Sequence, residues 1–185
     1  MKEHLLPAIK LTLISVFFFS VIYPTFIWGF AQVAPNKGKG FVVKQKGKVY
    51  YENMGQAFYS DQYFWSRPSA VSYNAAGSCG SNKGPSNADY LILVQQRIDT
   101  FMVHNPGVKK SDIPADLITA SGSGLDPDIS PQAATVQIKR IAKSRNLSEA
   151  KVKELINQSI EKPFLGLFGP EKINVLQLNL KLENL

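Results

Sequence analysis

The chain has 185 residues, of which 44% are hydrophobic and 19% charged, and its formal net charge is +7 at pH 7. This length suits one domain with an additional segment. The basic residues are scattered and not interleaved with aromatic residues as in an RNA-binding strand, so we predict no nucleic-acid partner. One cysteine, Cys79, excludes an internal disulfide framework and a cysteine-based zinc site.

The first apolar run predicts a membrane-spanning helix. Residues 11–33, LTLISVFFFSVIYPTFIWGFAQV, contain no charged side chain, and such a helix, rising about 1.5 Å per residue, can cross a hydrocarbon core of about 30 Å. Pro24 is tolerated in a membrane helix. A cleaved signal peptide is the alternative, but its apolar region usually has only about 7–15 residues. We therefore predict a short N-terminal segment (residues 1–10), an uncleaved transmembrane helix (11–33) and a soluble domain (34–185).

The charges that flank this helix do not determine its orientation. Lys2 and Lys10 precede the helix, and five lysines follow it within residues 37–48. Charge counting alone places the long C-terminal part in the cytoplasm. Long domains, however, translocate largely regardless of flanking charge, so the sequence leaves the orientation open.

A short flexible linker, residues 35–40, and a small hairpin follow. The hairpin sequence FVVKQKGKVYY has strand-forming residues on both sides of a turn at Lys46-Gly47. Residues 58–85 are rich in aromatic residues, Gly, Ser and Asn and keep no regular period, which predicts an irregular segment. A segment of this length is unusual in a compact domain unless it carries function or packs against a partner. The structural alternative is that its aromatic side chains hold it to the core.

Three helices are predicted in the second half of the chain. The first has an apolar row and ends at Asn105-Pro106-Gly107. The second begins with Ser130 as N-cap and Pro131 as first residue, and it runs to about Arg145. The third begins at Leu147-Ser148. The residues expected on the inner faces of these helices are Leu91, Val94, Ile98, Phe101 or Met102, then Ala134, Ile138, Ile141, and then Val152, Leu155, Ile156 and Ile160.

The segment LQLNLKL, residues 176–182, alternates leucine with polar residues and predicts a half-buried strand. The expected fold class is therefore α+β: a single N-terminal transmembrane helix followed by one compact soluble α+β domain.

Residues 121–127, Ser-Gly-Ser-Gly-Leu-Asp-Pro, are typical of a phosphate loop, a nucleophilic serine or a tight bend. A phosphate loop of the Walker type needs a lysine, and the segment has none. The spacing does not match a nucleophile elbow, and a Ser-His-Asp arrangement would depend on His104 alone. We favour a bend in which Gly122 and Gly124 are free to take positive φ and Asp126 caps the following amides.

Four sequence blocks, in this order behind one N-terminal span, resemble the C subunit family (KdpC) of the Kdp high-affinity potassium-transporting ATPase: YFWSRPSA, GSNKGPSN, DLITASGSGLDPDISPQAA and FGPEKINVLQLNL. The resemblance covers essentially the whole chain. It implies a non-catalytic subunit that assembles with a potassium-binding channel-like subunit, an ATP-hydrolysing subunit and a small membrane subunit. The sequence agrees, because it lacks the phosphorylated Asp-Lys-Thr-Gly motif of a P-type pump and one helix cannot enclose an ion pathway.

The resemblance implies two mechanisms. In the first, the subunit is a catalytic chaperone that raises the ATP affinity of the hydrolysing subunit in a transient complex, with no tightly bound cofactor. In the second, the domain is an extracytoplasmic lid or stabiliser of the potassium-binding subunit, without nucleotide contact.

The resemblance also implies a single-pass protein of the cell inner membrane, with Met1 to Lys10 in the cytoplasm and residues from about Pro35 outside. A membrane-anchored hydrolase using Ser121 or Ser123, and a free-standing membrane-anchored binding protein, are further alternatives.

Two groups of residues are candidates for function, and neither is expected to be catalytic or to bind a metal. Gln137 and Arg140 lie one helical turn apart and are the best candidates for ATP contact, the amide at a base edge and the guanidinium at phosphate. The second group comprises polar residues of the irregular segment and the glycine turn, which we expect near one another or on one partner-facing surface, with Arg67 close to Asp126. Its members are Arg67, Asn74, Ser81, Asn82, Ser121, Ser123 and Asp126.

Overall fold

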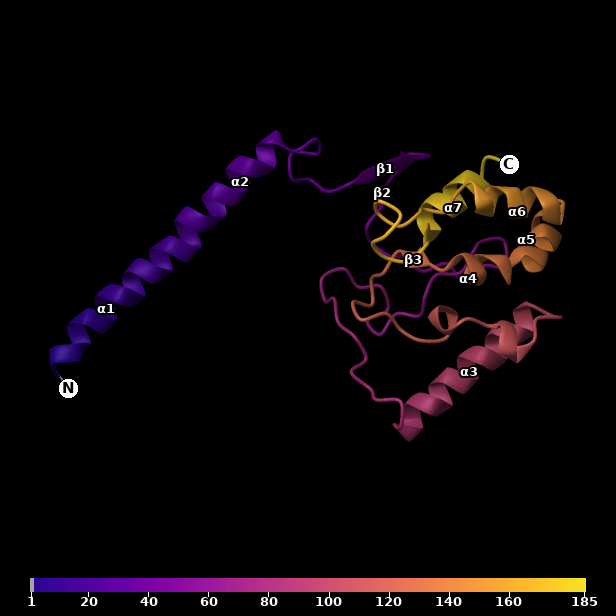
Figure 1. Ribbon diagram of the computed structural model, residues 1–185, viewed down its shortest axis with the longest axis horizontal. Coiled ribbons are helices and arrows are strands. Elements are labelled where there is room, and N and C mark those ends of the chain that lie inside the picture. The colour runs from indigo at the N-terminus through magenta and orange to yellow at the C-terminus, as the bar shows by residue number, and fades with distance from the viewer. Residues whose placement is uncertain (1) are drawn as a thin grey trace. The chain divides into compact units, whose positions relative to one another are not determined.

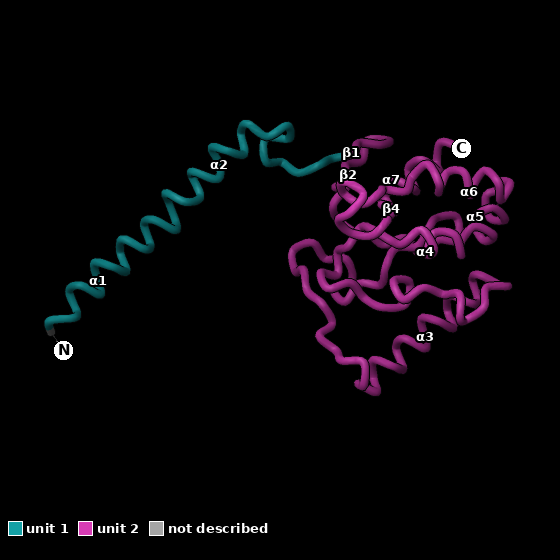
Figure 2. The backbone as a smooth tube through the Cα atoms, in the orientation of Figure 1, with its two compact units in different colours: residues 1–42 teal, residues 43–185 magenta. Residues whose placement is uncertain are grey.

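The structure, a computed structural model, describes residues 2–185; Met1, which begins the predicted N-terminal segment, lies outside the described residues. The chain forms two compact units, Met1–Val42 and Val43–Leu185 (Figure 2). The linker that follows the apolar helix belongs to the first unit.

The first unit is built on one long apolar helix. It comprises α1 (Lys2–Phe17), the π-helical turn η1 (Phe18–Ile22) and α2 (Tyr23–Val33), which run continuously (Figure 1). The stretch Glu3–Val33 is long and apolar enough to cross a membrane, and none of it is buried within the protein. Its 31 residues span about 46 Å, which exceeds the hydrocarbon core of about 30 Å. The helix thus extends beyond the predicted residues 11–33 on the N-terminal side.

The π-helical turn has a local cause in Pro24. A proline inside a helix removes one backbone hydrogen bond, and its ring approaches the carbonyl of the residue four positions earlier, here Ser20. The backbone widens at this place, and Tyr23 donates its N–H to the carbonyl of Phe18, five residues back. The wider turn accommodates the proline without breaking the helix.

The second unit contains two small sheets and a set of short helices, which confirms the α+β class. The hairpin of β1 (Val42–Gln45) and β2 (Lys48–Tyr51) turns at Lys46-Gly47, as predicted; both turn residues have positive φ, 48° and 76°. The second sheet pairs β3 antiparallel with β4. The remaining elements are α3 (Ala88–His104), η2 (Lys110–Asp112), η3 (Ala115–Leu117), β3 (Asp128–Ile129), α4 (Pro131–Thr135), α5 (Ile138–Arg145), α6 (Glu149–Asn157), β4 (Ile173–Asn174) and α7 (Val175–Leu182).

Short polar residues determine where these helices begin. Asn87, Ser130, Ser148 and Asn174 precede α3, α4, α6 and α7, and each accepts a hydrogen bond from the backbone N–H three residues later. The predicted N-cap at Ser130 is confirmed. At the other end of α5, Asn146 takes the left-handed conformation with φ 55°, which ends that helix.

The prediction of a strand in residues 176–182 was wrong, because these residues form α7. Val175, Leu178 and Leu182 recur with a helical spacing and are buried, and the polar Asn179 completes the same buried face. The alternation of leucines suggested a strand because Asn179 was expected to point to solvent.

The predicted helix from Ser130 to about Arg145 is two helices, so that prediction was wrong in part. The backbone leaves the helical pattern at Val136-Gln137, between α4 and α5. The predicted inner residues Ala134, Ile138 and Ile141 are buried. In α3, the predicted apolar row is buried only toward the C-terminal end, since Ile98 and Phe101 are buried whereas Leu91 is 52% exposed.

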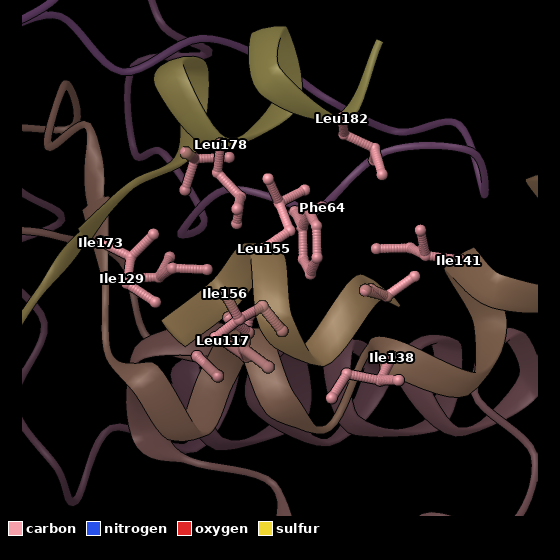
Figure 3. Close-up of a cluster of buried hydrophobic side chains, with 14 of the residues drawn as sticks. Phe64, Leu117, Ile129, Ile138, Ile141, Leu155, Ile156, Ile173, Leu178 and Leu182 are labelled. Carbon is pink, nitrogen blue, oxygen red and sulfur yellow. The ribbon is translucent and has the colours of Figure 1, made fainter. Parts of the chain in front are cut away.

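The core lies among α4 to α7 and is completed by a side chain from the irregular segment. Phe64 is fully buried against the aliphatic residues of these helices, including Ile141, Leu155 and Leu178 (Figure 3). Its backbone is held by Asn179, whose Oδ1 accepts from Phe64 N at 2.8 Å and whose Nδ2 donates to Phe64 O at 3.0 Å. The irregular segment is thereby attached to the core, in agreement with the alternative that its aromatic side chains hold it there.

Candidate functional site

The guanidinium of Arg140 organises the turn formed by residues 60–65. Nη1 donates to the carbonyl oxygens of Asp61 at 2.7 Å and Tyr63 at 3.0 Å, and Nε donates to Oδ1 of Asn105 at 3.0 Å. The guanidinium also lies over the indole ring of Trp65, 4.7 Å from the ring centroid. Arg140 therefore connects α5, the end of α3 and the irregular segment.

Gln137 lies in the same cluster and is fully buried. Its Oε1 accepts from Trp65 N at 2.8 Å and from Arg140 Nη2 at 2.5 Å, while its Nε2 donates to the carbonyl of Ala133 at 2.9 Å. Gln137 lies on the same buried face as Ala133 and Ile141, at intervals of four residues. Gln137 and Arg140 are thus close together, as predicted, but they do not form an exposed polar stripe, because Arg140 is only 6% exposed.

Burial of the cation has a clear electrostatic effect. It lowers the pKa of Arg140 to about 10, because a low-dielectric surrounding disfavours the charged form, and the nearby Asp61 carboxylate, 3.8 Å from Nη1, opposes this shift. Arg140 therefore remains charged at neutral pH. The Asp61 carboxylate also lies 2.9 Å from Nδ1 of His104.

A hollow of about 500 Å³ opens beside this cluster. Basic side chains line it: Lys139 and Lys143 from α5 and His104 from α3, together with the carboxylate of Asp61. Lys139 and Lys143 are exposed, unlike Arg140. Chemically, this hollow can attract an anion, and the exposed lysines are the groups free to meet it.

The second candidate cluster joins the irregular segment to the glycine turn. Arg67 Nη1 donates to Asp126 Oδ2 at 2.7 Å, which confirms the proximity expected of this pair. Asp126 Oδ1 accepts from the N–H of Asp128 at 3.0 Å, so the predicted cap on a following amide is also formed. One carboxylate thus stabilises both the turn and its contact with the irregular segment.

Backbone contacts hold the rest of the glycine turn in place. Gly124 has φ 68°, and its N–H donates to Oγ of the buried Ser121 at 2.9 Å. The carbonyl of Gly124 accepts from Ser69 Oγ at 2.6 Å, and the carbonyl of Ser123 accepts from Cys79 N at 3.0 Å. The turn is therefore a bend that organises the loop around it.

Four of the seven predicted loop residues form side-chain hydrogen bonds within the glycine turn or to it: Arg67, Ser121, Ser123 and Asp126. The other three, Asn74, Ser81 and Asn82, are exposed. Asn74 accepts from the N–H of Ala76 within its own turn, and Asn82 has a positive φ of 53°. That these residues face a partner stays a prediction.

The geometry does not support the hydrolase alternative. His104 Nδ1 is bonded to Asp61, as in a triad, but Ser121 is 4% exposed and its Oγ accepts from Gly124 N. Ser123 Oγ accepts from Leu125 N at 3.1 Å. Within residues 2–185, no hydrogen bond joins His104 to either serine, so the described residues form no nucleophile and base pair.

Two buried asparagines were missed from the sequence. Asn105 holds Arg140, and Asn179 holds the backbone of Phe64. Asn105 was interpreted only as a helix stop because Pro-Gly follows it. Asn179 stands in a run of leucines, and a polar residue at helical spacing from Val175 and Leu182 was the available signal for its inward position.

In the described residues, one apolar helix long enough to cross a membrane precedes one compact α+β domain, which is the architecture of a single-pass membrane protein. Comparison with known proteins makes this specific. Residues 5–184 match the KdpC family model, described as K+-transporting ATPase, c chain. The chain is 57% identical to a potassium-transporting ATPase KdpC subunit of Flavobacterium johnsoniae, with 99% of each chain covered. It is 55% identical to the one from Bacteroides thetaiotaomicron, with 98% of each covered, and 46% identical to the one from Caldanaerobacter subterraneus subsp. tengcongensis, with 98% and 95% covered. The chain belongs to the KdpC family, which confirms the resemblance seen in the four sequence blocks.

Proposed function

We propose that the protein is a non-catalytic subunit of an ATP-driven potassium uptake complex, and that its domain lies outside the cytoplasm as a lid or stabiliser of the potassium-binding subunit. Membership of the KdpC family supports the assignment to this complex. The other partners in this proposal are the ATP-hydrolysing subunit, the small membrane subunit and the lipid bilayer. The N-terminal end of the apolar helix is then cytoplasmic.

One observation carries the choice of mechanism: Gln137 and Arg140 are already engaged inside the domain. The guanidinium is bound by backbone carbonyls and by the amides of Asn105 and Gln137. A phosphate bound by this guanidinium would have to replace its bonds to the turn at residues 60–63 and to Asn105. Leaving those buried acceptors without donors is costly. This supports a structural role for the pair rather than direct nucleotide contact.

Direct help with ATP binding is the second candidate, and the basic hollow beside Arg140 favours it. Lys139 and Lys143 are exposed there and can meet an anion without disturbing the core. The test is the ATP dependence of the complete complex carrying Lys139→Gln and Lys143→Gln together. We expect an unchanged KM for ATP, because the proposed domain is separated from cytoplasmic nucleotide by the membrane. A KM raised several-fold, with assembly intact, would instead favour the chaperone mechanism.

The topology itself is tested with Cys79, the single cysteine, which is exposed. In intact spheroplasts, a membrane-impermeant maleimide is expected to label Cys79 without lysis, because the proposed domain is extracytoplasmic. Cys79→Ser is the control for specificity, and labelling in denaturant controls for coverage by partner subunits. Labelling that requires lysis would place the domain in the cytoplasm and overturn the proposed mechanism.

A further inference from the structure

A second, tight hairpin projects from the domain between α6 and β4. At its base, Glu161 and Lys172 exchange two backbone hydrogen bonds, of 2.8 and 3.2 Å. Nearer the tip, Phe164 and Phe168 exchange two more, both of 3.0 Å. The chain reverses at Leu165-Gly166, where both residues have positive φ. Residues 163–169 therefore form an ordered apolar tip.

The side chains of this apolar tip point away from the core. Phe164, Leu165, Leu167 and Phe168 are 72%, 73%, 81% and 64% exposed. The sequence from Pro163 to Pro170, PFLGLFGP, has no polar side chain. A positive φ is also unfavourable for Leu165, yet the turn keeps it. Four large apolar side chains exposed at one projecting point indicate a surface that meets an apolar partner.

The chain is too short to carry this domain far from the bilayer that holds its own helix. Helix α2 ends at Val33 and β1 begins at Val42. The eight residues between them reach at most about 30 Å when fully extended. A lipid surface is therefore always within reach of the domain, whichever side of the membrane it occupies.

Exposed lysines lie on the apolar hairpin and on the hairpin next to it, and Glu161 and Glu171 are exposed at the base of the apolar hairpin as well. Asn174, two residues after the base of the apolar hairpin, donates to the carbonyl of Glu52 at 2.7 Å, and Glu52 directly follows β2. The apolar hairpin and the β1–β2 hairpin thus lie beside each other (Figure 1). Lys44 and Lys48 are exposed on the β1–β2 hairpin, and Lys162 is exposed at the apolar one. Apolar side chains with neighbouring lysines are the combination that binds an anionic lipid surface.

We propose that the apolar tip, residues 163–169, inserts into the lipid surface of the membrane in which the chain's own helix is anchored. Its phenylalanines and leucines enter the boundary between headgroups and acyl chains, and the neighbouring lysines contact anionic headgroups. Lipid fits better than a protein partner, because the tip is highly exposed and carries no polar side chain, whereas protein interfaces combine an apolar centre with a hydrogen-bonding rim. The domain then has two membrane attachments, the helix and the apolar tip.

The test uses the full chain, without other subunits, in nanodiscs of phosphatidylethanolamine and phosphatidylglycerol. In a Cys79→Ser background, a spin label is attached at Leu167→Cys. The matched control is Val103→Cys in α3, because Val103 is 77% exposed, close to the 81% of Leu167. We expect the label at 167 to lose collisions with a water-soluble nickel chelate several-fold and to gain collisions with oxygen, whereas the label at 103 keeps the behaviour of an aqueous site.

Two further measurements distinguish insertion into lipid from contact with a protein partner. Adding Phe164→Glu and Phe168→Glu is expected to return the label at 167 to water, since charged side chains are expelled from the acyl region. Equal nickel access at 167 and 103 in lipid alone overturns the proposal. Protection at 167 that appears only in the complete complex also overturns it and identifies a protein partner. Because a nanodisc offers lipid on both sides, the result does not depend on which side of the membrane the domain occupies in the cell.

Discussion

Replacing Arg140 by methionine is expected to lower the free energy of unfolding by about 3 kcal/mol. The substitution removes the donor to the part-buried carbonyl of Tyr63 and to the buried amide oxygen of Asn105, whereas the carbonyl of Asp61 keeps its bond from Ser144 Oγ. Each unsatisfied buried acceptor costs about 1–3 kcal/mol. The stacking on Trp65 is lost as well. Removing a desolvated charge offsets part of this loss, which keeps the net effect below the sum.

The matched control for this prediction is Lys143→Met. Lys143 lies on the same helix and carries the same charge, but it is exposed. We expect its loss to change the free energy of unfolding by less than about 0.5 kcal/mol. The measurement is urea unfolding of the full chain in detergent, followed by near-ultraviolet circular dichroism of the domain. Equal effects of the two substitutions would contradict the role assigned to the Arg140 cluster.

Replacing Gly124 by alanine is expected to destabilise the domain by about 2–4 kcal/mol. Gly124 has φ 68°, and a Cβ there would lie 2.6 Å from Cγ2 of Val71 and 2.9 Å from the carbonyl oxygen of Cys79. The left-handed backbone costs a residue with a Cβ about 1–2 kcal/mol, and overpacking typically adds about 1–3 kcal/mol. We expect the same unfolding measurement to report both terms together.

Gly122, two residues earlier in the same turn, provides the control. A Cβ at Gly122 would meet nothing within 4 Å, and its φ lies outside the left-handed region. Gly122→Ala should therefore be neutral, or slightly stabilising because it restricts the unfolded chain. If Gly124→Ala were equally harmless, the positive φ and the close packing at Gly124 would not contribute to stability.

Features determined by local chemistry could be predicted from the sequence. The hairpin turn at Lys46-Gly47 and the N-cap at Ser130 depend on residues within a few positions of each other. The pairing of Arg67 with Asp126 was also expected, since a proline restrains one partner and a turn holds the other. In the folded domain, the hairpin turn and the N-cap keep the conformations that their own residues favour.

Apart from the Arg67–Asp126 pair, which spans 59 residues, features determined by long-range contacts could not be predicted. Asn179 lies on the buried face of α7, where its side chain bonds the backbone of Phe64, 115 residues earlier. The local pattern of leucines does not contain this contact. Gln137 is buried, and its Oε1 accepts from the backbone N–H of Trp65, 72 residues earlier. Sequence periodicity assigns a polar side chain to solvent unless its buried partner is known.

The attachment of the irregular segment to late parts of the chain has a consequence for biosynthesis. Residues 52–64 leave the ribosome early, but Glu52 and Phe64 are held by Asn174, Gln177 and Asn179, up to 125 residues later. During synthesis, this segment therefore has no stable conformation until α7 has been made. The apolar helix, in contrast, needs only its own residues to enter the membrane. If the helix anchors the chain and the domain lies outside the cytoplasm, as proposed, the nascent chain is anchored first and its domain is still unfolded when it passes a translocation channel.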